Sequence, residues 1–230
     1  MDDFSLIQKV IIWGLPMIFA ITVHEVAHGW VAMKLGDRTA QMLGRLTLNP
    51  IKHIDPFGTI VVPALLFMAG GFMFGWAKPV PVTYQNLRKP KSDMAWVAIA
   101  GPASNLVMAI LWAVEAKIGL AIYSSGIAIG ELMIFMGIAG VIVNLMLMTL
   151  NLLPLPPLDG GRILTSLLPG PLAWKVSRIE PYGFFILMVL LYFGILGQLI
   201  WPLISTCISI ISVVFGVPQQ LFFIALNDLS

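Results

Sequence analysis

Two histidines and a glutamate lie close together in an otherwise apolar stretch near the start of the chain: His24, Glu25 and His28. Residues four apart share one face of a helix, with Cβ atoms about 5–6 Å apart, so both imidazoles can reach one metal ion. Glu25 is next to them and is free to take or give a proton. Ionisable side chains are costly at membrane depth, so this cluster indicates a functional site.

The same spacing can arise by chance on an ordinary solvated helix, where the three side chains would only face water. The flanking segments 18–23 and 30–33 are apolar, so this helix has no solvated face. A metal site is therefore the better interpretation.

The composition is that of an integral membrane protein. The chain has 230 residues, of which 59% are hydrophobic and 10% are charged. A soluble domain has about 25% charged residues, and a chain of this length could not bury so much apolar surface in water. Cys207 is the one cysteine, which excludes an internal disulfide and a cysteine-ligated metal site.

No repeat, low-complexity tract or large polar segment interrupts the chain, so we predict a single intramembrane domain over residues 1–230. The N-terminus starts with acidic residues rather than the basic residues of a cleavable signal peptide, and we expect the first helix to be retained.

The hydropathy pattern predicts an all-α polytopic membrane protein, a bundle of about four to six transmembrane segments. A last apolar run is interrupted at Trp201-Pro202, where we expect a helix to end. Residues 41–48 could form short β-strands, and the prolines of 79–82 exclude a helix there. Long helices are expected over three ranges: 4–35, 93–117 and 127–153.

Eleven of the thirteen Lys and Arg residues lie in three stretches, 34–52, 78–91 and 162–178. The positive-inside rule places all three stretches in the cytoplasm. This requires the apolar run 57–77, which contains proline and several glycines, to be a re-entrant segment. The His24–His28 cluster then lies near the cytoplasmic face.

A catalytic zinc ion typically has three protein ligands and an open position for water, so the two histidines need a partner. Asp159 follows three prolines that end a helix, and Gly160-Gly161 follow it. Asp-Gly also occurs in simple turns. The topology, however, places Asp159 at the depth of the histidines, which favours a ligand.

Three segments together resemble the site-2 protease family of intramembrane zinc metalloproteases, peptidase family M50, in its small form without PDZ or CBS domains. They are 24–28, 101–105 (Gly-Pro-Ala-Ser-Asn) and 151–161. The resemblance covers essentially the whole chain. It implies that His24, His28 and Asp159 bind one zinc ion and that Glu25 is the catalytic carboxylate. It also implies that Asn151 matches the active-site asparagine of the family and that Asn105 matches the asparagine of its Gly-Pro motif.

The predicted function is hydrolysis of peptide bonds within or near transmembrane segments of membrane proteins, with Glu25 as general base. Asn105 and Asn151 are candidates to hold the substrate backbone or the oxyanion, because an amide donates without adding charge. Hydrogen bonding between helices is the alternative for both. The unwound substrate would pair as a strand with 41–48 or 79–82.

A membrane metal-ion transporter or channel is the alternative function, since paired histidines and acids also line ion paths. Such a path needs ligands at successive depths, whereas the polar residues here gather at one level. A catalytically inactive scaffold is disfavoured because Glu25 is present beside both histidines. His53 is followed by Asp55-Pro56 in a loop, where a turn-bonded imidazole is a better interpretation than a fourth ligand.

Overall fold

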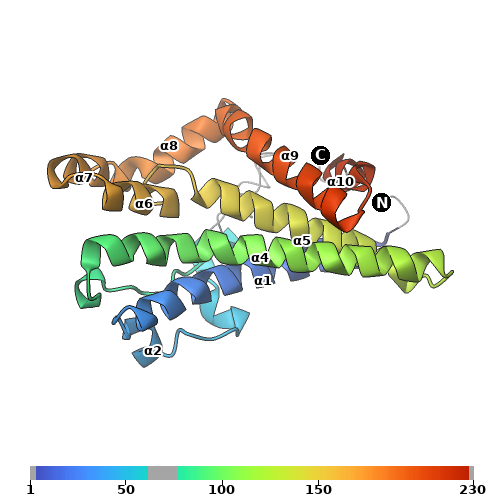
Figure 1. The fold of residues 1–230 in the computed structure, drawn as a ribbon, viewed down its shortest axis with the longest axis horizontal. Helices are drawn as coiled ribbons and strands as arrows, with labels where there is room; N and C mark the ends of the chain where they lie inside the picture. Colours follow the sequence, from blue (N-terminus) through green and yellow to red (C-terminus); the bar gives the residue numbers. More distant parts are fainter. Residues whose placement is uncertain (1–3, 62–76, 228–230) are drawn as a thin grey trace.

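The computed structural model describes residues 4–61 and 77–227, and it shows an elongated bundle of helices (Figure 1). Within these two ranges, four helices are long and apolar enough to cross a membrane: α1 (Leu6–Lys34), α4 (Pro90–Ser124), α5 (Ile129–Asn151) and α9 (Ile195–Phe215). The prediction of an all-α, multi-pass membrane protein is confirmed. The three predicted long helices correspond to α1, α4 and α5.

The first helix begins where its sequence provides a cap. The Ser5 hydroxyl accepts a hydrogen bond from the Gln8 backbone amide, and the Gln8 side chain accepts one from the Ser5 amide. This reciprocal pair satisfies two amides that have no partner inside the helix. The helix ends at Lys34, just before Gly36, whose φ of 119° is accessible to glycine.

Helices α4 and α5 lie side by side at the centre of the bundle (Figure 1), and small residues allow their close approach. A Cβ atom at Gly140 would lie 2.2 Å from the ring of Trp112, so only glycine fits at that crossing. Helices α1, α9 and α10 (Gln219–Asn227) pack around this pair and share one apolar core with it. Close packing of this kind holds helices together where water provides no driving force.

The segment after α1 contains short helices instead of the predicted strands. Among the described residues there is no strand, and 41–48 is occupied by the end of α2 (Thr39–Met42) and a turn at Gly44. Just before α2, the Asp37 carboxylate accepts a hydrogen bond from the Thr39 amide, which favours a turn at this point. The strand prediction for 41–48 is therefore wrong.

Most of the predicted re-entrant segment, 57–77, lies outside the described residues. The 3₁₀ helix η1 (Pro50–His53) comes before it, and the π-helix η2 (Pro56–Val61) forms its first residues. Its two flanks meet, because the Lys78 amide donates a hydrogen bond to the His53 carbonyl at 2.9 Å. The residues on either side of the undescribed part are therefore neighbours, and the re-entrant path itself remains a prediction.

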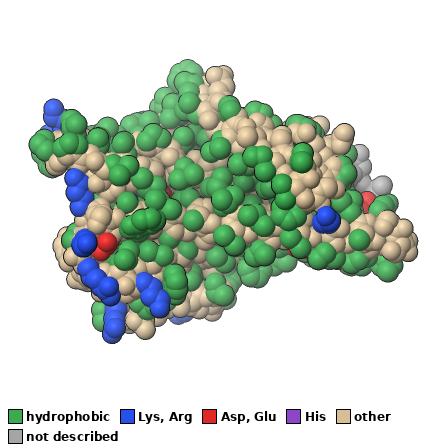
Figure 2. All heavy atoms as spheres, viewed as in Figure 1, with side chains coloured by type: hydrophobic (Ala, Val, Ile, Leu, Met, Phe, Trp, Pro, Cys, Tyr) green, Lys and Arg blue, Asp and Glu red, His purple; other side chains and the backbone are tan. Residues whose placement is uncertain are grey.

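Residues 77–83 have no helical structure, as the prolines predict, and lead through η3 (Tyr84–Asn86) into α4. Beyond α5 come three shorter helices: α6 (Asp159–Leu167), α7 (Gly170–Ser177) and α8 (Glu180–Tyr192). Figure 2 shows Lys and Arg side chains gathered at the end that carries α7 and the start of α4.

The break in the last apolar run is not at Trp201-Pro202. The run is broken at Gly194 and Gly216, whose φ values of 70° and 67° separate α8 from α9 and α9 from α10, while Pro202 remains inside α9. A glycine in the left-handed conformation ends a helix at no steric cost, whereas proline is tolerated inside membrane helices. The sequence expectation gave proline too much weight.

Candidate metal centre

Helix α1 supplies two imidazoles that point to the same place. His24 is buried, and the ring centroids of His24 and His28 are 4.6 Å apart at an interplanar angle of 85°. Their Nε2 atoms are 3.0 Å apart. The four-residue spacing thus delivers the geometry expected for two ligands of one ion.

Helix α4 presses against these rings at Gly101. A Cβ atom on Gly101 would lie 2.5 Å from His28 Nε2 and 2.6 Å from His24 Nε2, so any side chain there would displace both nitrogens. The glycine of the Gly-Pro sequence therefore has a spatial function: it lets α4 cover the histidine pair.

The two Nδ1 atoms face oxygen acceptors on α4. His28 Nδ1 is 2.7 Å from the Val97 carbonyl oxygen, and His24 Nδ1 is 2.6 Å from Asn105 Oδ1. Each Nδ1 therefore carries the ring proton and donates it, and each Nε2 of a neutral imidazole has a free lone pair.

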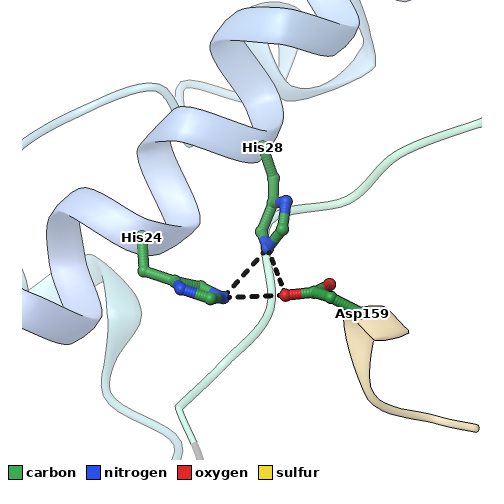
Figure 3. A group of neighbouring side chains, drawn as sticks. All are labelled: His24, His28 and Asp159. Atoms are coloured by element: carbon green, nitrogen blue, oxygen red, sulfur yellow. Dashed lines mark hydrogen bonds and ion pairs between the residues drawn. The ribbon is translucent and has the colours of Figure 1, made fainter. Parts of the chain in front are cut away.

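Asp159 completes the group from the first residue of α6. Its Oδ2 lies 3.2 Å from the Nε2 atoms of both His24 and His28, and the three side chains point toward one another (Figure 3). The adjoining turn fits only glycine at position 160, where a Cβ atom would lie 2.3 Å from the carbonyl oxygens of Leu152 and Leu153. This close turn brings the start of α6 back to the end of α5.

The group fits a metal cation. Two imidazole lone pairs and one carboxylate oxygen converge, and buried Asp159 Oδ2 has no hydrogen-bond donor among the described residues. Three acceptors at 3.0–3.2 Å repel one another unless a positive charge lies between them. Two nitrogens and one carboxylate oxygen, with room for water, are a typical catalytic zinc set.

The ionisation of Asp159 also depends on positive charge beside it. Burial by itself raises the pKa of this carboxyl, but protonated His24 and His28 imidazoles outweigh burial and hold the pKa well below its usual range. With both imidazoles neutral, a cation bound between the three side chains would take over this role.

Glu25 lies beside the group without joining it. Among the described residues the candidate metal group consists of His24, His28 and Asp159. The Oε2 atom of Glu25 accepts a hydrogen bond from the Val80 backbone amide at 2.6 Å. This contact links the carboxylate to the irregular segment 77–83.

Asn105 makes its hydrogen bonds between helices. It is fully buried, its Oδ1 accepts from His24 Nδ1, and its Nδ2 donates to the Ala20 carbonyl and to Asn144 Oδ1. Both N–H groups of the amide are therefore engaged. This arrangement favours the helix-to-helix alternative for Asn105 over contact with a substrate.

Sequence reasoning did not single out Asn144. The sequence could have pointed to it, because Asn144 is the one polar side chain within the otherwise apolar helical stretch 138–145. Asn151, at the end of α5, is half-buried and donates to the Leu147 carbonyl at 3.0 Å. His53 is buried and bonds the Thr47 carbonyl oxygen through Nε2 at 2.9 Å, in agreement with its turn-bonded interpretation.

Comparisons with known proteins agree with this chemistry. The model of peptidase family M50 matches residues 114–193. A protein of Bacillus subtilis (strain 168) that carries a zinc metalloprotease name, YwhC, is 42% identical over 198 residues, covering 83% of this chain and 84% of that protein. No solved structure matches the chain.

Two more distant relatives also carry zinc metalloprotease names. Rip2 of Mycolicibacterium smegmatis is 31% identical over 196 residues, covering 81% of this chain and 69% of its own length. MJ0611 of Methanocaldococcus jannaschii is 29% identical over 168 residues, covering 72% of this chain and 74% of its own length. With its apolar helices and its metal group, the chain belongs to peptidase family M50 and is a membrane zinc metalloendopeptidase of the site-2 protease type.

Proposed function

We propose that this enzyme cuts peptide bonds within or near the transmembrane segments of other membrane proteins, the reaction of regulated intramembrane proteolysis. One observation carries the proposal: two of the three residues of the metal group, His24 and His28, lie on α1, a helix that is long and apolar enough to cross a membrane. His24 is about 15 Å along α1 from Lys34, at about 1.5 Å per residue. Residues 1–230 act as a single domain in this proposal.

His24, His28 and Asp159 hold one zinc ion in this proposal. When bound, zinc supplies Lewis-acid chemistry, which polarises a carbonyl and makes water acidic near neutral pH. Glu25 takes the proton from the attacking water and returns it to the leaving amine. The Val80 amide fixes Oε2 of Glu25, which leaves Oε1 for the proton.

Asn151 is the remaining candidate to contact the substrate. One N–H of its side-chain amide is bonded to Leu147, and the second N–H is available to a substrate carbonyl or to the oxyanion. Its position at the end of α5, just before the turn to Asp159, supports this role.

The substrate is proposed to bind as extended chain beside residues 79–82. Prolines 79 and 81 have no amide hydrogen, and the Val80 amide is bonded to Glu25, so this segment offers mainly carbonyl oxygens. Addition of a strand supplies backbone hydrogen bonds to an unwound segment that would otherwise lose them inside the membrane. Single-span proteins with helix-weakening residues near their cytoplasmic end fit this mode.

The active site is proposed to lie near the cytoplasmic face. Lys and Arg side chains gather at the end of the bundle where α4 begins (Figure 2), and positive residues favour the cytoplasmic side. The enzyme class given by the family favours hydrolysis over the metal-ion transporter or channel alternative.

A reconstituted assay tests the function. The purified protein in liposomes is given a single-span substrate with glycine and proline in its membrane segment, and zinc is measured by elemental analysis. We expect one zinc per chain and cleavage inside or beside the segment. Glu25→Gln should keep the zinc and lose cleavage, whereas His24→Ala and Asp159→Asn should lose zinc sharply. Cleavage confined to soluble peptides would contradict the intramembrane assignment.

A further inference from the structure

Three buried side chains form one continuous hydrogen-bond chain from α1 through α4 to α5. His24 Nδ1 donates to Asn105 Oδ1 at 2.6 Å, Asn105 Nδ2 donates to Asn144 Oδ1 at 2.9 Å, and Asn144 Nδ2 donates to the Gly140 carbonyl at 2.8 Å. Asn105 and Asn144 are both 0% exposed. Water therefore cannot replace any member of the chain.

Backbone carbonyls determine which group donates and which accepts at each step of this hydrogen-bond chain. The Gly140 and Ala20 carbonyls can only accept, so they determine which end of each amide is the NH₂ group. Asn144 must then turn its oxygen to Asn105, and Asn105 must turn its oxygen to His24. The histidine proton is consequently on Nδ1, and the Nε2 lone pair faces Asp159.

The two histidines differ in the contact that keeps the ring proton on Nδ1. His28 donates directly to the Val97 carbonyl, a backbone group that no substitution removes. His24 depends on an asparagine amide, and that amide depends on a second one. A carboxamide that loses its partner can rotate and present NH₂ to the imidazole, which would favour the wrong tautomer.

We propose that Asn144 is a positioning residue for the metal centre: through Asn105 it holds His24 in the tautomer and orientation that bind zinc. The inference rests on the proposed ligand role of His24. Groups that orient a metal-ligating histidine typically change metal affinity about 10–100-fold when they are removed. Asn144 acts through one intermediate, so we expect a loss of about tenfold.

Zinc affinity, measured by competition with a chelator on full-length protein in detergent, is the readout. Asn144→Leu replaces the amide by a side chain with the same branching and the same number of heavy atoms, and should weaken zinc binding about tenfold. Asn144→Asp keeps an acceptor for Asn105, and as a buried neutral acid it can still donate to Gly140, so its affinity should stay within about threefold of the parent. Asn144→Ser, too short to reach Asn105, is the milder substitution if the leucine variant does not fold.

Thr149→Val is the matched control. Thr149 is a buried polar residue on the same helix, and its hydroxyl has no hydrogen-bond partner among the described residues. A substitution at a buried position can lower stability without affecting the metal site. The unfolding temperature is therefore recorded beside the zinc affinity for every variant. A Thr149→Val protein with unchanged zinc affinity supports the proposal, and an equal loss in both variants overturns it.

A double-variant comparison separates positioning from packing. If both asparagines act through one chain, Asn105→Leu with Asn144→Leu should bind zinc no more weakly than Asn105→Leu alone. Unchanged zinc affinity in Asn144→Leu and Asn144→Ser, with only a lower unfolding temperature, would leave Asn144 a purely structural residue. If His24→Ala keeps its zinc, the proposed metal site itself is wrong, which is a separate result.

Discussion

The carboxylate of Glu25 accepts a hydrogen bond from the backbone amide of Val80, at 2.6 Å, across 55 positions of sequence. One residue is on α1 beside the metal group, and the other is in the irregular segment before α4. The proposed general base and the proposed substrate-binding segment are therefore in direct contact. Movement of one changes the position of the other.

Gly29→Ala tests this contact. A Cβ atom at Gly29 would lie 2.7 Å from Val80 Cγ1 and 3.2 Å from Leu46 Cδ2, so the added methyl group pushes Val80 away from α1. We expect cleavage to fall about 10–100-fold, as for other small displacements at active sites, with zinc content unchanged. Gly14→Ala is the control on the same helix, since nothing lies within 4 Å of its Cβ. Full activity in Gly29→Ala would refute the coupling.

Gly101→Ala should act on the metal itself. Its methyl group would overlap the Nε2 atoms of both histidines, at 2.5–2.6 Å. We expect zinc affinity to fall more than tenfold, measured by chelator competition, with cleavage lost in proportion. Gly197→Ala on α9, where a Cβ meets nothing within 4 Å, should bind zinc like the parent protein. Equal affinity in the two variants would show that α4 does not press on the site.

The pH dependence of stability should report on Asp37. Burial raises the pKa of Asp37, but hydrogen bonds from Thr39, Thr83 and Asn86 outweigh burial and hold the pKa below its usual range. A lowered folded-state pKa contributes stability that is complete above the unfolded value of about 4 and is lost as the pH falls through the folded pKa.

Asp37→Asn should therefore lower the unfolding temperature at pH 7, because hydrogen bonds to a charged acceptor contribute about 1.5–3 kcal/mol each before competing costs. The difference from the parent should shrink as the pH falls below about 4. Thermal unfolding in detergent at both pH values measures it. If the difference in unfolding temperature between Asp37→Asn and the parent grew on acidification, the prediction would be wrong.

Cysteine labelling tests the orientation of the bundle. Arg45→Cys, Arg88→Cys and Lys175→Cys, each in a Cys207→Ser background, should all react from the cytoplasmic side. The Arg88 amide donates to the Leu35 carbonyl at the end of α1, which places this position beside the end of the first span. Labelling of position 88 from the opposite side would invalidate the proposed orientation.

Substrate unwinding is the last prediction. Replacing Gly, Pro or Asn in a substrate's membrane segment by Leu strengthens its helix, and each step should slow cleavage because the bond must enter the site as extended chain. Leucine replacements outside the cleaved region provide the control. Cleavage rates that do not change with the helix propensity of the substrate segment would exclude strand pairing beside residues 79–82.

The sequence predicted those features that depend on local spacing. A four-residue interval on a helix places His24 and His28 together whatever the rest of the chain does. Prolines 79 and 81 likewise exclude a helix from local geometry alone. The convergence of Asp159 on the histidines was expected from charge distribution, and the structure brings it within 3.2 Å of both.

Features that depend on packing between distant segments could not be predicted. The orientation of Asn105 toward His24 is determined by carbonyls on two other helices, which no local pattern reveals. The Asp37 carboxylate, just before α2, accepts hydrogen bonds from Thr39 nearby and from Thr83 far along the chain. Such contacts exist only after the helices have packed.

The position of Asp159 in the chain has a consequence for biosynthesis. Helices α1, α4 and α5 precede α6, so a growing chain can insert three spans while it carries the histidines without their carboxylate partner. The metal group is complete only after α6 has left the ribosome. A nascent enzyme at the insertion machinery therefore lacks a full set of metal ligands until α6 has joined the histidines.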